Sequence, residues 1–194
     1  MKEELLKLQK EIHANAVEKG FWKNNPSKEQ MLMLVITEIA EVVEADRKKK
    51  YGRVDDSSIV DYKNQVCGNQ DKAKELVYRT QIRAYTFHIK GTIEEELADV
   101  AIRLLDYMAG FDEKLSEDEF DNYANGEVIK NPVCDQMFYL TGSLVGSFTG
   151  NSSISATLGA LFPFAKSLDI DLLWHIKEKM RYNESRPMLH NKKY

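Results

Sequence analysis

The sequence predicts an all-α protein, because helix-start signals and helical apolar spacing recur while no convincing pair of strands occurs. A capping box, Ser or Thr followed three residues later by Glu or Gln, is found at Ser27, Thr92 and Ser116. Apolar residues at intervals of three and four follow the first two of these signals. The chain has no internal repeat and no low-complexity segment.

The N-terminal part is expected to form two helices, over residues 3–19 and 31–47. Gly20 follows the first helix, and Ser27 caps the second. The second helix begins with six consecutive apolar residues and is followed by three lysines, whose charges suit a helix C-terminus. A helix that is apolar nearly all round in its first half is expected to be buried.

The middle of the chain is less regular. Within residues 52–91, the stretch 54–68 is polar and shows no clear period, whereas residues 70–88 are compatible with a helix. Long connections of this kind are usually functional or mobile. Thr92 then begins a strongly apolar helix over residues 94–109, which Gly110 is expected to end.

Three more helices are predicted before the C-terminal one. A short acidic helix starts at Ser116. Asn131 and Pro132 are a suitable N-cap and first helical residue for a helix that runs to about residue 148. Another follows over residues 154–168, with Pro163 as a kink or break.

Length and composition narrow the function classes. A chain of 194 residues forms one domain, or one domain with an elaboration. Its net charge of −4 argues against nucleic acid as a partner. The two cysteines are far apart and outside any metal-binding spacing, which predicts free thiols in a cytoplasmic protein. The charged N-terminus is not a signal peptide and no apolar run is long enough to span a membrane, so no membrane partner is expected.

Two pairs of acids, each one helical turn apart, lie on the two most apolar helices. Glu38 and Glu41 belong to the first, and Glu96 and Asp99 to the second. Antiparallel packing would bring these four carboxylates together, where burial is costly unless a cation offsets it. Oxygen ligands suit hard divalent cations, so the acids are expected to bind Mg²⁺, with Mn²⁺ as a substitute. Solvated surface acids are the simpler alternative.

The last helix carries a second chemical signal. It is expected to begin at Asp169 or Asp171 and to run to about Arg186. Lys179, Asn183 and Arg186 fall at i, i+4 and i+7, so one face presents an ammonium, an amide and a guanidinium. These groups suit phosphate oxygens. Basic residues near a helix C-terminus also favour the helix dipole, which is the alternative explanation.

The acidic pairs resemble a known family signature. Glu38-Ile-Ala-Glu41 followed by Glu96-Leu-Ala-Asp99 resembles the ExxE…ExxD pattern of the MazG-like all-α nucleoside triphosphate pyrophosphohydrolases. That group includes the dimeric dUTPases, the dCTP pyrophosphatases and phosphoribosyl-ATP pyrophosphatase. The closing segment, residues 179–187, resembles the basic helix end of many MazG-like proteins.

Two N-terminal residues extend the resemblance. His13 and Trp22 precede the first acidic pair at spacings similar to a His and a Trp that contact the nucleotide in dCTP-pyrophosphatase-like proteins. Both are therefore expected to bind substrate. On this resemblance, residues 1–194 form a single MazG-like helical domain with an insertion at about 48–91 and an extra helical region at about 111–168.

The resemblance implies a helical bundle of the MazG-like type that forms a homodimer or homotetramer. The four acids would hold one to three Mg²⁺ ions that grip a nucleoside triphosphate and activate a water. The reaction cleaves the substrate between its α and β phosphates to a nucleoside monophosphate and pyrophosphate. Glu44 and Glu95 would orient the water or a metal, and the three residues of the last helix would steady the phosphates.

Two other functions stay open at this stage. The first is a non-enzymatic helical dimer or adaptor, whose acid pairs are solvated faces or form interhelical salt bridges with Arg47 and Arg103. The second is a pyrophosphohydrolase that acts on another nucleotide, such as phosphoribosyl-ATP or a nucleotide-sugar. Arg103 stands where dCTPase-like relatives carry an aromatic residue, which leaves the base of the substrate undetermined.

Overall fold

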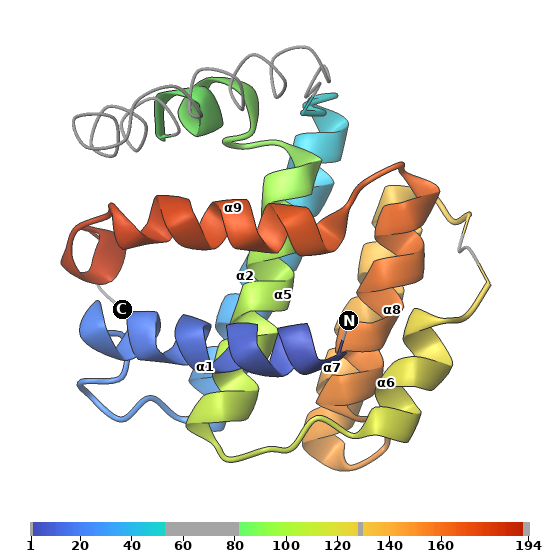
Figure 1. Ribbon diagram of the computed structural model, residues 1–194. Helices are drawn as coiled ribbons and strands as arrows, with labels where there is room; N and C mark the ends of the chain where they lie inside the picture. Colours follow the sequence, from blue (N-terminus) through green and yellow to red (C-terminus); the bar gives the residue numbers. More distant parts are fainter. Residues whose placement is uncertain (1, 53–81, 128–129, 192–194) are drawn as a thin grey trace.

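A computed structural model describes residues 2–52, 82–127 and 130–191 (Figure 1). These ranges contain helices and no strand, which confirms the all-α prediction. The helices with described bounds are α1 (Lys2–Glu18), α2 (Lys28–Arg47), α5 (Ile93–Gly110), α6 (Glu117–Ala124), α7 (Val133–Thr149), α8 (Ile154–Ser167), α9 (Leu172–Glu184) and the 3₁₀ turn η1 (Met188–Asn191). None of the helices in these ranges has the length and apolar character needed to cross a membrane.

Only part of the predicted helix at 70–88 can be compared with the structure. Residues 82–88 are helical. The earlier part of that helix, and most of the insertion predicted at 48–91, lie outside the described residues.

Helix α5 lies at the centre of the arrangement. It packs against α1, α2, α8 and α9, and buried residues occur on all of its sides. Figure 1 shows α2 and α5 side by side and antiparallel, with α1 and α9 crossing them and α6, α7 and α8 grouped at one side. The Ile93 N–H donates to the Lys50 carbonyl at 3.0 Å, which joins the end of α2 to the start of α5. This pairing brings the two acidic segments together.

Several predicted caps are confirmed. Ser27 and Thr92 each accept a hydrogen bond from the backbone N–H three residues later, at 3.2 and 3.4 Å. Asp171, rather than Asp169, caps α9 and accepts from the N–H of Trp174 at 3.0 Å. Ser116 precedes α6 as predicted, but its side chain makes no capping bond.

Two proline positions differ in part from the expectations: the N-cap of α7 is shifted by one residue, and the possible break at Pro163 is absent. Pro132, not Asn131, is the N-cap of α7, because its ψ of 144° is extended rather than helical. Asn131 instead donates from its side chain to Gln136 Oε1 at 3.0 Å. Pro163 lies inside α8 without ending it. The buried side chains on either side, Leu161 and Phe164, explain this, since tertiary packing supplies most of the stability of a protein helix.

Helices α6 and α8 cross at Gly159. A Cβ there would lie 2.7 Å from the backbone oxygen of Phe120 and 3.0 Å from Cβ of Tyr123. The backbone of Phe120 cannot rotate away from the added methyl group as a side chain could. Gly159→Ala is therefore expected to lower the free energy of unfolding by about 1–3 kcal/mol. Urea denaturation measures the change. The control is Gly142→Ala on α7, where nothing lies within 4 Å of the new Cβ and stability is expected to rise by up to about 1 kcal/mol. Equal stability of the two variants would contradict the crossing.

Candidate metal and phosphate site

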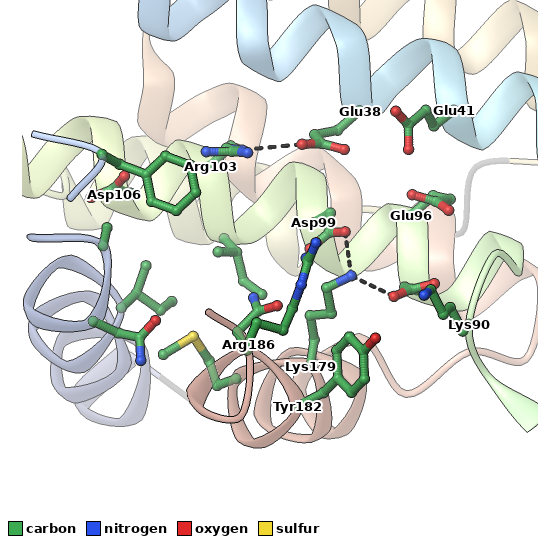
Figure 2. A pocket seen from close by; sticks show the side chains of 18 of the residues that line it. Glu38, Glu41, Lys90, Glu96, Asp99, Arg103, Asp106, Lys179, Tyr182 and Arg186 are labelled. Carbon is green, nitrogen blue, oxygen red and sulfur yellow. Dashed lines mark hydrogen bonds and ion pairs between the residues drawn. The ribbon is translucent and has the colours of Figure 1, made fainter. Parts of the chain in front are cut away.

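A cavity of about 210 Å³ lies between α1, α2, α5 and α9. Figure 2 shows the acids of α2 and α5 on one side of it, opposite Lys179 and Arg186. Among the described residues its lining carries six carboxyl groups and four basic groups, a formal excess of two negative charges. One divalent cation would balance that excess.

Three of the four predicted ligands converge on one point. Glu38, Glu41 and Glu96 each offer a carboxylate oxygen, and these three oxygens lie within 4.8 Å of one another. The antiparallel pairing of α2 with α5 and the one-turn spacing of the acids place them there. Glu38 and Glu96 are buried, while Glu41 is exposed. A set of carboxylate oxygens fits Mg²⁺ or Mn²⁺ by ligand type.

Burial and neighbouring carboxylates both disfavour the ionised form of Glu96. Burial, reinforced by the neighbouring Asp99 and Glu95 carboxylates, raises the pKa of Glu96 to about 8. In the metal-free protein at neutral pH this carboxyl therefore holds a proton. A divalent cation bound at the cluster would displace that proton, since ligand carboxyls must be ionised.

Asp99, the fourth predicted ligand, is engaged elsewhere. Its Oδ2 lies 2.6 Å from the ammonium of Lys179, which also forms a hydrogen bond and ion pair with Glu95. Lys179 is only 4% exposed. Burial alone lowers the pKa of this lysine, but the Asp99 and Glu95 carboxylates outweigh burial and raise it, so the ammonium stays charged.

The arginine pairs proposed for an adaptor are present in part. Arg103 Nε donates to Glu38 Oε1 at 3.1 Å, an interhelical pair between α5 and α2. Arg47 instead pairs with Glu44 on its own helix at 3.2 Å. Glu44 does not line the cavity, whereas Glu95, the other residue expected near the site, does.

The predicted phosphate-binding residues lie together on the opposite wall. Lys179, Asn183 and Arg186 all line the cavity. Asn183 is buried, and its Oδ1 has no hydrogen-bond partner within the described part of the chain. The Arg186 guanidinium lies 5.9 Å from the centre of the Tyr182 ring, which stacks on Tyr85 at 4.7 Å. The amide N–H group of Asn183 and the Arg186 guanidinium can both donate hydrogen bonds to the oxygens of a polar ligand in the cavity.

His13 and Trp22 do not line the cavity described above. Both bond to the buried carboxylate of Asp106, His13 through Nδ1 at 2.8 Å and Trp22 through Nε1 at 3.0 Å. The Trp22 ring packs against Gly110, where an added Cβ would lie 1.9 Å from it. The neighbouring Phe21 lines the cavity instead. Contact of His13 and Trp22 with a nucleotide stays a prediction.

Sequence reasoning left several residues of the lining unassigned to the site, and four of them carry a carboxyl, ammonium or aromatic group: Phe21, Lys90, Asp106 and Tyr182. Asp106 shares the acidic edge of its helix with Glu96 and Asp99 at helical spacing, so its position was readable from the sequence. Tyr182 follows Lys179 by three residues and precedes Arg186 by four, so its position was readable in the same way. Phe21 and Lys90 carried no such signal, because they reach the cavity only through the packing of separate segments.

The chain matches no protein-family model, no curated protein and no solved structure. The resemblance to MazG-like proteins therefore stays a prediction. The function of this chain is proposed below from the arrangement of its own side chains.

Proposed function

We propose that the protein is a Mg²⁺-dependent nucleoside triphosphate pyrophosphohydrolase. One observation carries the proposal: the carboxylates of Glu38, Glu41 and Glu96 converge on one wall of a cavity whose opposite wall presents Lys179 and Arg186. Phosphoryl transfer depends mainly on positioning and on neutralisation of phosphate charge. A divalent-cation site facing basic side chains supplies both.

In the proposed reaction a water adds to the α-phosphorus and the bond from that phosphorus to the α–β bridging oxygen breaks. The products are a nucleoside monophosphate and pyrophosphate. A divalent ion at the three acids supplies charge neutralisation and an acidified water when bound. Arg186 donates to phosphate oxygens, Asn183 orients the polyphosphate through its amide, and Arg103 holds Glu38 in place.

The size of the cavity fits the phosphate end of the substrate. Its volume, about 210 Å³, is below the roughly 300–1,000 Å³ of pockets that enclose a whole drug-sized ligand. The nucleoside would therefore extend beyond it, past Phe21 or Tyr182, whose flat rings suit stacking with a base.

We also propose a cytoplasmic location and a homodimer or homotetramer for the protein.

A nucleotide screen tests the proposal. The purified chain is incubated with each ribo- and deoxyribonucleoside triphosphate and with phosphoribosyl-ATP, in Mg²⁺, and pyrophosphate is assayed. We expect pyrophosphate from at least one of these, with turnover lost in EDTA and regained in Mn²⁺. Release from phosphoribosyl-ATP alone would favour the alternative substrate. Absence of any product, orthophosphate alone, or turnover that persists in EDTA would contradict the proposal.

A non-enzymatic adaptor is the second candidate, and the ion pairs of Glu38 with Arg103 and of Asp99 with Lys179 favour it. These two cations do not restore the ordinary pKa of Glu96, which burial and the neighbouring Asp99 and Glu95 carboxylates keep raised. An adaptor would therefore retain a buried carboxyl, Glu96, that costs free energy and contributes nothing to its function. A negative nucleotide screen would support it.

Metal affinity is expected to increase with pH. Glu96, whose pKa is about 8 without metal, must lose its proton to bind a cation, so affinity should rise by up to about ten-fold per pH unit below 8 and then level off. Without metal the free energy of unfolding should fall as pH rises from 4.5 to about 8, because the folded state holds a proton that the unfolded state releases. Calorimetric Mg²⁺ titrations at pH 6 to 9 measure the affinity. A pH-independent affinity would contradict this role of Glu96.

A further inference from the structure

We propose that Lys179 is an internal counter-ion that keeps Asp99 out of the metal site in the nucleotide-free protein. Asp99 becomes available as a ligand only when a polyphosphate draws the ammonium away. This inference rests on the proposed function, because it concerns the order in which metal and nucleotide engage the same cavity. It makes full assembly of the metal site depend on the presence of substrate.

The geometry of Asp99 supports the first half of the inference. Asp99 is one helical turn from Glu96, yet it is not among the three acids whose oxygens converge. Figure 2 shows its carboxylate directed at Lys179 and away from Glu38 and Glu41. The ammonium contacts Asp99 and Glu95 at once, and the lysine side chain is 5% exposed. Lys179 thus places a single positive charge between two carboxylates, one of them the fourth predicted ligand, beside the cluster of three acids.

The surroundings of Lys179 support the second half. Asn183, one turn later on α9, is buried, and its Oδ1 accepts no hydrogen bond from any described residue, while its Nδ2 can donate to a phosphate oxygen. Arg186 follows at the same wall. A polyphosphate bound by Asn183 and Arg186 would bring several negative charges to the end of the flexible lysine stem, and an ammonium is a point charge that can reorient. The lysine would then exchange two carboxylates for phosphate oxygens.

Electrostatics set the expected effect of removing the lysine. A positive charge in contact with Asp99 opposes a cation at the adjacent cluster, and it also withholds a carboxylate ligand. Lys179→Met should therefore strengthen divalent-cation binding by at least about ten-fold, although the nucleotide is absent. The gain should require Asp99, so it should disappear in the double variant Lys179→Met with Asp99→Asn.

The test measures Mn²⁺ binding without nucleotide, from the electron paramagnetic resonance signal of free Mn²⁺, at pH 8.5 so that Glu96 is mainly ionised. The proteins are the parent, Asp99→Asn, Lys179→Met, the double variant and the control Lys177→Met. Lys177 lies on the same helix and forms an ion pair with Glu4, but it does not line the cavity. We expect the parent and the control to bind alike within about two-fold, and Lys179→Met alone to bind more tightly. Asp99→Asn should bind at most about five-fold more weakly than the parent, because it removes a neighbouring negative charge but no ligand.

The outcomes separate the inference from the proposed function. If the parent binds Mn²⁺ and Lys179→Met binds it no more tightly, the metal site stands and the counter-ion role of Lys179 is overturned. If Asp99→Asn alone weakens Mn²⁺ binding by ten-fold or more, Asp99 is already a ligand without nucleotide and the inference is overturned. This comparison does not depend on whether Lys179→Met folds. If the parent binds no Mn²⁺ at all, the metal site and the proposed function fail together.

Discussion

Replacing Glu96 with Gln is expected to reduce pyrophosphate release by about 10³-fold or more. The glutamine keeps the shape of the side chain but removes one of the three convergent carboxylates. A metal ion contributes several kcal/mol of transition-state stabilisation, and each 1.4 kcal/mol corresponds to about ten-fold in rate. Steady-state kinetics in saturating Mg²⁺, with the nucleotide found by the screen, measure the loss.

The matched control is Glu119→Gln, an exposed residue of α6 outside the cavity lining. It makes the same chemical change at a distance from the cluster and should retain the activity of the parent. A Glu96→Gln variant within ten-fold of the parent would remove Glu96 from the metal site.

The largest loss of stability is expected from Asp106→Ala. Asp106 is 2% exposed and accepts hydrogen bonds from the indole N–H of Trp22 while bonding to His13. Each buried polar group left without a partner costs about 1–3 kcal/mol, so the free energy of unfolding should fall by about 2–4 kcal/mol. Urea denaturation of the metal-free protein gives this value without any contribution from the site.

Asp106→Asn is the control for that change. Its amide oxygen still accepts from Trp22 and its volume is unchanged, so it should lose less than half as much stability as Asp106→Ala. Burial raises the pKa of Asp106, which makes a neutral amide a tolerable substitute. An alanine variant as stable as the parent would show that Asp106 does not anchor the segment that holds Phe21 and Trp22.

The parts of the fold that sequence predicted well depend on local rules. The caps at Ser27 and Thr92 and the apolar faces of α2 and α5 involve residues within two turns of each other. The same locality explains why the convergence of Glu38, Glu41 and Glu96 was predictable: one-turn spacing fixes their side of each helix.

The parts that sequence did not predict depend on contacts between distant segments. The pairing of Lys179 with Asp99 joins residues 80 positions apart and requires α9 to cross α5 at one register. Helical spacing predicted the face of the last helix on which Lys179 lies, but it could not predict that Asp99 is its ion-pair partner. Trp22 lies in a turn, where no periodicity indicates the direction of a side chain, and so its placement against Gly110 was not foreseen.

Thermal melts with and without Mg²⁺ test the central claim, that the acids of α2 and α5 bind a divalent cation. At pH 8.5 and at a Mg²⁺ concentration about 100 times Kd, the parent should melt about 5–10 °C higher than in EDTA. Glu96→Gln should melt at or above the parent in EDTA, because it relieves repulsion among carboxylates, and should gain little from Mg²⁺. A parent without a Mg²⁺-dependent shift, together with a Glu96→Gln variant that melts lower in EDTA, would instead identify an ordinary salt-bridged helix face.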